Sequence, residues 1–171
     1  MPTVLIIAGP NGAGKTTFAN EILRRRSEAF EFVNADEIAR RITGSITEGA
    51  RDLLAGRAML RRLDELTALR CDIALETTLA TLSHARRIGA WRAKGYRVEL
   101  IYLRLAAVED SLARVRRRVA MGGHDIREAD IRRRFQRSLD YLDAVYKPVV
   151  DRWQVWSNGD DGLKLLDWSP R

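Results

Sequence analysis

The sequence predicts an α/β fold, a three-layer α/β/α sandwich in which helices cover both faces of a mostly parallel five-stranded sheet. Short apolar runs rich in Val, Ile and Leu alternate along the chain with longer segments of helical periodicity. A glycine-rich segment follows the first of these runs and precedes the first helix, an order typical of phosphate-binding proteins. The 171 residues contain no repeat, low-complexity stretch or linker, so we expect a single domain over residues 1–171.

The glycine-rich segment 9–16 has the sequence GPNGAGKT and fits the P-loop pattern G-x-x-x-x-G-K-[ST]. The apolar run 3–8 before it predicts a buried parallel strand, and 17–23 predicts a helix. An ordinary glycine-rich turn carrying a surface lysine is the alternative, but the strand–loop–helix context favours a P-loop NTPase fold. We expect the phosphates of ATP or GTP to be bound by Gly9, Pro10, Asn11, Gly12, Ala13, Gly14, Lys15, Thr16 and Thr17.

Two of these residues have a further predicted role in chemistry. Lys15 is expected to reach the β- and γ-phosphates, and the Thr16 hydroxyl to bind Mg²⁺. The sequence therefore predicts a nucleoside triphosphate and Mg²⁺ as cofactors.

The other elements follow in order along the chain. Further strands are predicted at 30–34, 72–76, 96–104 and 152–156, and helices at 35–40, 47–70, 81–94, 108–121 and 128–146. Gly95 and Pro148 are typical of the ends of helices. After a turn at 158–162, residues 163–168 could pair back onto the last strand as a hairpin.

Ligands of parallel sheets bind beyond the carboxyl ends of the strands, so the residues at those ends are the candidate site residues. Asp36, after the second strand, could take a proton from an attacking hydroxyl or hold Mg²⁺ through water; the alternative is an N-cap of the next helix. Glu76 closes an apolar strand, where a carboxylate needs a partner, and could bind a substrate hydroxyl or order Mg²⁺. Thr78 could contact substrate or phosphate, or be a turn residue.

An arginine-rich segment predicts a helical lid over the transferred phosphate. Arg114 and Arg118 are four residues apart on one helix, so they share a face and are our candidate catalytic arginines. Gly122 and Gly123 would form a bend before the next helix, which carries Arg132, Arg133, Arg134 and Arg137. His124, at the bend, is a candidate donor to substrate phosphate. The alternative is a solvated charge run neutralised by neighbouring carboxylates.

Composition restricts the class of protein. Net charge is +7 and the chain has only four lysines, so arginine supplies nearly all of the positive charge. Arginine suits bidentate phosphate binding, in nucleic acids or in small molecules. No apolar run could span a bilayer, and the first strand begins too early for a signal peptide to precede it. With a single cysteine, Cys71, we expect a cytoplasmic protein that does not contact membranes.

Four motifs together resemble the zeta-toxin family of P-loop kinases. They are GPNGAGKTT at 9–17, VNAD at 33–36, ETTL at 76–79 and RVAMGGH at 118–124. The resemblance covers most of the chain, from Val4 to about Val145, and implies ATP-dependent phosphorylation of a hydroxyl of UDP-N-acetylglucosamine. It also implies an antitoxin protein as a candidate partner.

The resemblance also assigns roles to residues. It implies Lys15 and Thr16 on ATP·Mg²⁺, Asp36 as the base, Glu76 and Thr78 on the substrate side, and Arg114 as a phosphate-binding arginine. Zeta toxins are larger than this chain, and a second lid arginine of the family falls near His124, where Arg118 or Arg127 could replace it.

Four functions compete for this sequence. The leading one is phosphoryl transfer from ATP to the hydroxyl of a small molecule, the acceptor. An ABC-type ATPase would need a Leu-Ser-Gly-Gly-Gln-type signature and an Asp-Glu Walker B motif, and the sequence has neither. A nucleic-acid-binding protein or polynucleotide kinase would fit the net charge but lacks a cluster of stacking aromatics. A non-enzymatic nucleotide-binding module would bind ATP without turnover.

Overall fold

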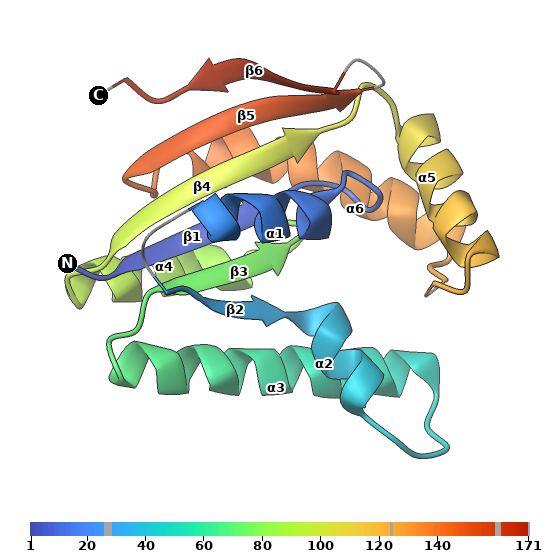
Figure 1. Cartoon of the computed structure of the whole chain (residues 1–171), viewed down its shortest axis with the longest axis horizontal. Helices are drawn as coiled ribbons and strands as arrows, with labels where there is room; N and C mark the ends of the chain where they lie inside the picture. Colours follow the sequence, from blue (N-terminus) through green and yellow to red (C-terminus); the bar gives the residue numbers. More distant parts are fainter. Residues whose placement is uncertain (26–28, 124, 160–161, 171) are drawn as a thin grey trace.

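A computed structural model describes residues 1–25, 29–123, 125–159 and 162–170, and in it six strands form one sheet in the order β2-β3-β1-β4-β5-β6 (Figure 1). The first five strands run parallel and β6 pairs antiparallel with β5. The predicted mostly parallel sheet is confirmed, with a sixth strand where we expected five, because the hairpin does form. The strands are β1 (Thr3–Ala8), β2 (Glu31–Asn34), β3 (Ile73–Thr77), β4 (Arg97–Arg104), β5 (Arg152–Gly159) and β6 (Gly162–Trp168).

The helices lie where the apolar periodicity predicts them, with small changes at their ends. The first begins at Lys15, inside the P-loop motif, and the last predicted helix ends as a short π-helix that reaches Tyr146. Those described are α1 (Lys15–Arg25), α2 (Ala35–Arg41), α3 (Glu48–Ala68), α4 (Ser83–Ala93), α5 (Val108–Ala120), α6 (Glu128–Tyr141) and the π-helix η1 (Leu142–Tyr146).

Two apolar cores lie on opposite faces of the sheet. On one face, α1 packs against alternate residues of β1 and β4, among them Leu5 and Leu103. On the other face, α3, α4 and η1 pack against Val4, Ile6 and Leu100. Figure 1 shows α1 in front of the sheet and α4 and α6 behind it. Because adjacent residues of a strand point to opposite faces, the continuous apolar run of β1 serves both cores.

The register of the central strands brings the candidate residues together. Glu76 of β3 lies level with Asn34 of β2 on one side and with Ile7 of β1 on the other. One residue after Ile7, β1 ends at Ala8 and the P-loop begins. The ends of β1, β2 and β3 thus meet at one edge of the sheet.

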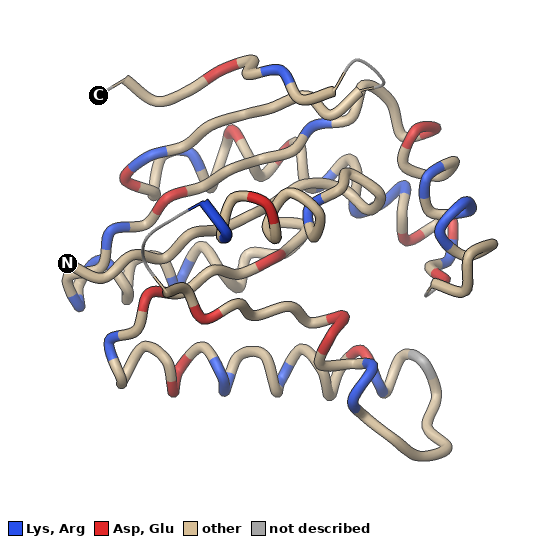
Figure 2. Tube along the Cα trace, viewed as in Figure 1, with Lys and Arg blue, Asp and Glu red and all other residues tan. Residues whose placement is uncertain are grey.

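The pair α5 and α6 lies beyond this edge and has a small apolar core of its own. Leu112, Val115 and Ile131 form it, far fewer residues than either main core. The predicted bend follows α5, where the backbone of Gly123 lies so close to Arg118 that an added Cβ would be 2.6 Å from the Cγ of Arg118. Charged residues, blue and red in Figure 2, are frequent on both helices.

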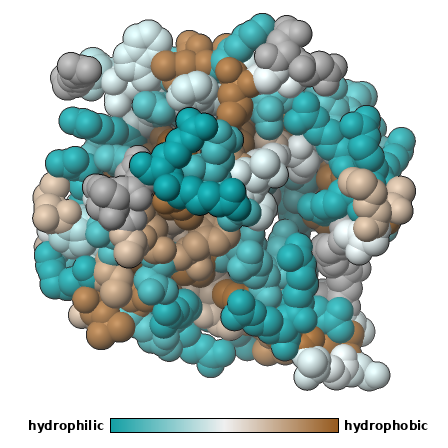
Figure 3. Space-filling model, in the orientation of Figure 1, coloured by the Kyte–Doolittle hydropathy of each residue, from teal (hydrophilic) through white to brown (hydrophobic). Residues whose placement is uncertain are grey.

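The last strand is the outer edge of the sheet and is exposed along its whole length. Leu163, Leu165, Leu166 and Trp168 are its large exposed apolar residues, and Figure 3 shows hydrophobic residues along the top of this face, where β6 lies. As expected, the tryptophans at 153, 156 and 168 are sheet residues. Over the residues that the structure describes, every helix is too short or too polar to cross a bilayer.

Candidate active site

The backbone of the P-loop is held in a conformation that only glycine adopts without strain. Gly9 has φ +146°, and a Cβ there would lie 2.3 Å from the carbonyl oxygen of Leu103 in β4. Gly14 has φ +81°, and its Cβ would lie 2.7 Å from the Nδ2 of Asn158. Because α1 begins at Lys15, the N–H groups of its first turn have no carbonyl partner within the helix. The loop therefore presents a helix N-terminus suited to anions.

Lys15 is buried at the base of this loop. Its Nζ donates to the carbonyl oxygen of Pro10 at 3.0 Å and lies 3.9 Å from an oxygen of Glu76. Burial lowers the pKa of Lys15, and the carboxylates of Glu76 and Asp36 oppose that shift. The hydrogen bond to Pro10 thus fixes the direction of the ammonium group. Its counter-charge, the Glu76 carboxylate, is 3.9 Å away.

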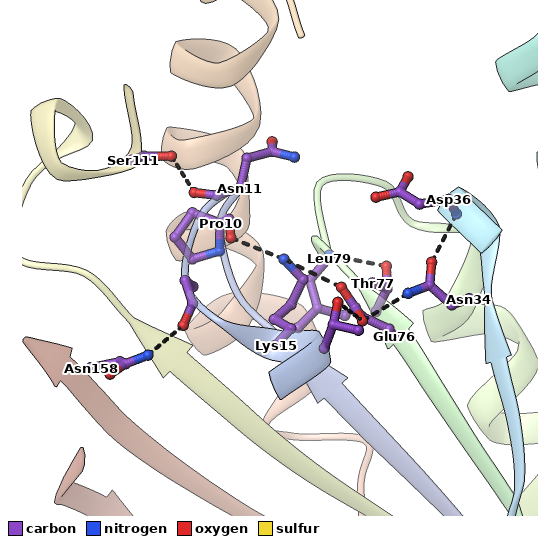
Figure 4. A network of polar contacts seen from close by, with 12 residues as sticks. Pro10, Asn11, Lys15, Asn34, Asp36, Glu76, Thr77, Leu79, Ser111 and Asn158 are labelled. Atoms are coloured by element: carbon purple, nitrogen blue, oxygen red, sulfur yellow. Dashed lines mark hydrogen bonds and ion pairs between the residues drawn. The ribbon is translucent and has the colours of Figure 1, made fainter. Parts of the chain in front are cut away.

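Glu76 joins the ends of three strands. Its Oε2 accepts from the Thr16 hydroxyl at 2.8 Å and from the Nδ2 of Asn34 at 2.9 Å (Figure 4). These contacts are the partners that a carboxylate at the end of an apolar strand needs. Burial raises the pKa of Glu76, while Lys15 and the Thr16 hydrogen bond act to lower it. Glu76 is therefore tied to the P-loop threonine, at the position predicted for Mg²⁺.

Asn34, and not Asp36, is the N-cap of α2. The Oδ1 of Asn34 accepts from the backbone N–H of Asp36 at 2.8 Å, so the capping alternative for Asp36 is wrong. The side chain of Asp36 is exposed, and Figure 4 shows its carboxylate projecting from α2 above the Glu76 contacts. Asp36 is thus available to a substrate.

Two contacts that the sequence did not predict brace the outer side of the P-loop. The Nδ2 of Asn158, at the end of β5, donates to the carbonyl oxygen of Ala13 at 2.8 Å. The hydroxyl of Ser111, buried in α5, donates to the carbonyl oxygen of Asn11. Arg114 packs its Cβ beside Gly12 and donates to the carbonyl oxygen of Asn158 at 2.8 Å. From the sequence, Asn158 is predicted only as a turn residue, because nothing in its local sequence indicates that it contacts the P-loop.

A cavity of about 740 Å³ opens beside Lys15. Its walls come from the P-loop, the start of α2, the first half of α3, the segment after β3 and one face of α6. Of the residues predicted for the site, those lining the cavity are Asn11, Lys15, Asp36, Glu76 and Thr78. Residues expected to bind the nucleotide and residues expected to bind the substrate thus line the same cavity.

The lid arginines are divided between two places. Arg114 and Arg118 of α5 are not among the described residues that line the cavity, and Arg114 lies instead against the P-loop. The arginines that do line it are Arg127, Arg133, Arg134 and Arg137, around α6. His124 lies outside the described residues. Local sequence pattern does not distinguish these arginines, because both helices carry them at helical spacing.

His84 is a cavity residue that sequence analysis missed. It lies at the start of α4, is buried, and lines the cavity near Thr81. Burial, aided by Arg87, lowers the pKa of His84 to about 4, so the imidazole is neutral at pH 7. Its Nδ1 is buried with no hydrogen-bond partner among the described residues. A lone histidine in a helical segment carries no pattern that could have indicated this position.

Comparison with known proteins gives a family and a fold. Residues 4–142 match the AAA domain family AAA_33. A Haemophilus influenzae protein, itself uncharacterised, is 30% identical over 132 residues, which are 77% of this chain and 91% of that protein.

Solved structures share the fold. A chain of the PezAT chromosomal toxin–antitoxin system of Streptococcus pneumoniae superposes with a TM-score of 0.70 and 18% identity, over 98% of this chain and 72% of that one. Shikimate kinase from Acinetobacter baumannii superposes with a TM-score of 0.54 and 21% identity, over 90% of this chain and 82% of that one. The predicted P-loop α/β/α fold is confirmed, and it is shared with a chain of a toxin–antitoxin system and with a kinase.

Proposed function

The chain belongs to the AAA domain family AAA_33, and from that premise we propose that it is an ATP-dependent kinase that transfers the γ-phosphate to the hydroxyl of a small molecule. One observation carries the proposal: Lys15 and Asp36, from different strand ends, line the same cavity. The lysine that would bind the γ-phosphate of the donor and the candidate base Asp36 thereby face one space, which could hold an acceptor. The acceptor would enter from the side of α3 and α6.

The transfer step follows from these positions. Asp36 takes the proton of the acceptor hydroxyl, whose oxygen forms a bond to the γ-phosphorus as the bond to the β–γ bridging oxygen breaks. ADP leaves with that oxygen. Lys15 stabilises the charge on the phosphoryl group, and the anion in turn offsets the cost of burying the ammonium.

Mg²⁺ would be held at Thr16, with Glu76 and Asp36 as further oxygen donors. The hydroxyl of Thr16 and the carboxylate of Glu76 are already 2.8 Å apart, and hard oxygen donors suit this ion. Among the described residues no group of three or more His, Cys, Asp and Glu side chains could hold a metal, so phosphate oxygens and water would complete the shell. When bound, the ion neutralises charge on the β- and γ-phosphates.

The arginines divide by position in this proposal. Arg114 contacts the P-loop side and would bind phosphates of the nucleotide, as the zeta-toxin resemblance implies. Arg118 and Arg134 are both near enough to Lys15 for their charges to act against its protonation, so both would face the transferred phosphate. Thr78 would hydrogen-bond the acceptor.

The finer assignments rest on the resemblance. They are a UDP-N-acetylamino sugar as acceptor and an antitoxin protein as partner. A cytoplasmic location is proposed separately, from the single cysteine, Cys71. The similar PezAT chain belongs to a toxin–antitoxin system, which supports an antitoxin as the partner. ATP is the proposed phosphate donor, with GTP as the alternative.

The test is an ATP-consumption screen over nucleotide sugars, sugars, amino alcohols and oligonucleotides. Lys15→Ala and Asp36→Asn should each abolish transfer while the circular dichroism spectrum is unchanged. Glu37→Gln is the matched control, because Glu37 is the next residue of α2 and is not a cavity residue. Full turnover by Asp36→Asn would remove Asp36 as the base, and turnover with oligonucleotides alone would favour a polynucleotide kinase.

A further inference from the structure

One wall of the cavity carries more positive charge than phosphoryl transfer uses. We propose that Arg137 binds an anionic group, a phosphate or a carboxylate, that the acceptor itself carries in addition to its reacting hydroxyl. The substrate class is then a negatively charged alcohol. This inference rests on the proposed kinase function and concerns the acceptor half of the same cavity.

The first argument is the face that α6 presents. Asp130, Arg133, Arg134 and Arg137 recur at i, i+3, i+4 and i+7, the spacing of a single helix face, and all four line the cavity. The adjacent face of the helix carries the buried residues Ile131, Phe135 and Ser138. Packing of this second face fixes the rotation of the helix. The arginine face is therefore held toward the cavity by the core behind it.

The second argument is that two of the four cavity arginines already share a carboxylate of the protein. Asp130 is buried, and its oxygens lie 2.8 Å from the Nη2 of Arg127 and 2.6 Å from the Nη2 of Arg133. Although burial acts to raise it, the pKa of Asp130 is lowered, because Arg127, Arg133 and Arg134 favour the carboxylate. Arg127 and Arg133 thus have an anion provided by the protein.

Arg134 and Arg137 have no hydrogen-bonded anion in the part of the chain that the structure describes, although the charge of Arg134 also acts on Asp130. Within the described residues, neither forms a hydrogen bond or an ion pair, although the cavity also holds the carboxylates of Asp36, Asp52 and Asp125. A planar guanidinium that lines a cavity and has no hydrogen-bonded carboxylate of the protein is suited to bidentate binding of a ligand phosphate or carboxylate.

The third argument separates the two arginines. Arg134 comes one turn after Asp130 on the cavity face of α6, and its charge favours the Asp130 carboxylate. Arg137 comes three residues later, which is about 4.5 Å along the helix axis. Assigning Arg134 to the transferred phosphate leaves Arg137 for a second anion. The anion and the reacting hydroxyl must then belong to one acceptor molecule.

The experiment uses matched acceptors that differ only in charge. The probes are glucose, glucose 1-phosphate and glucuronate, and glycerol, glycerol 3-phosphate and glycerate. Their binding to the full chain with Mg²⁺ and a non-hydrolysable ATP analogue is measured by calorimetry, and their turnover by ATP consumption. The variants are Arg137→Gln, Arg137→Lys and the control Arg132→Gln, an exposed α6 arginine that is not a cavity residue.

The wild type should bind the charged member of at least one set about 10- to 100-fold more tightly than its neutral member, the range expected for a charged hydrogen bond. Arg137→Gln should remove that ratio and leave the affinity for the ATP analogue unchanged. Arg137→Lys should keep part of it, and Arg132→Gln all of it. A phosphate preference over carboxylate, or the reverse, identifies the anion.

Two results would overturn the proposal: a wild type with no preference for charged probes, or an Arg137→Gln variant that keeps the preference. Because binding needs no phosphoryl transfer, its outcome is independent of turnover. Charge-selective binding without any turnover would support the anion site and argue against the kinase. Turnover of neutral probes alone would support the kinase and remove the anion site.

Discussion

The two walls of the cavity are built in different ways. On the donor wall, residues far apart in the chain hold one another: Thr16 and Asn34 bind Glu76, and Asn158 binds the backbone of the P-loop. On the acceptor wall, the face of α6, ion pairs join residues only three apart, such as Arg133 and Asp130. The first wall is fixed by tertiary contacts and the second by the geometry of one helix.

This difference matches the chemistry proposed for each wall. The triphosphate is the same chemical group whatever the acceptor, so its site gains from a loop that is fixed before it binds. Acceptors differ in shape and charge, and a helix face can change its specificity by single substitutions that leave the fold intact. We infer that donor-wall substitutions act on stability or on every acceptor alike, and that acceptor-wall substitutions change selectivity.

Gly9→Ala should break the donor wall most severely. The new Cβ would lie 2.3 Å from the carbonyl oxygen of Leu103 at a φ that alanine disfavours, so we expect about 3 kcal/mol of destabilisation and loss of ATP binding. Urea unfolding and ATP calorimetry measure both. Gly89→Ala, in α4 with open space around it, is the control and should be neutral or stabilising. Equal effects of the two would contradict a rigid P-loop.

Glu76→Gln tests whether the carboxylate at the centre of the donor wall serves the metal. The amide keeps the size of the side chain but removes a negative charge beside Thr16. We expect turnover to fall about 10- to 100-fold for all acceptors, with a higher Mg²⁺ concentration at half-maximal rate. Titration of Mg²⁺ at saturating ATP measures this. An effect confined to one acceptor would move Glu76 to the substrate side, as the zeta-toxin resemblance implies.

His84, a cavity residue of α4, should make the stability of the protein depend on pH. Its pKa of about 4 in the folded state lies below the ordinary value, so the unfolded chain binds the proton first as pH falls. The stability it contributes is present above about pH 6.5 and declines toward pH 4; between pH 7 and pH 5 the loss is about 2 kcal/mol. Urea unfolding at pH 7 and at pH 5 should show a smaller loss of stability for His84→Gln than for the wild type. The same loss in both proteins would argue against a buried neutral imidazole.

Asn158→Ala should have the smallest effect on the donor wall. It removes one hydrogen bond to the carbonyl oxygen of Ala13 and leaves that of Arg114 to the backbone of residue 158. A neutral hydrogen bond contributes about 1 kcal/mol, so the KM for ATP should rise about fivefold, with the selectivity among acceptors unchanged. A changed order of acceptor preference would show that the two walls are coupled.

The sequence determined the donor half of the candidate site and most of the elements. The P-loop, the alternating strands and helices, and the places of Asp36 and Glu76 at strand ends all follow from local patterns, because phosphate binding by a backbone loop depends on residues adjacent in the chain. The sequence also predicted that Glu76 needs partners, since an unpaired carboxylate at the end of an apolar strand is energetically unfavourable.

Only the tertiary structure decided the rest. The strand order, the contact of Asn158 with the P-loop and the burial of His84 all depend on residues far apart in the sequence. The choice among the arginines belongs here too. Helical spacing groups Arg134 with Arg137, but the apolar packing of α6 decides that this face meets the cavity, because burial of a helix's other face sets its rotation.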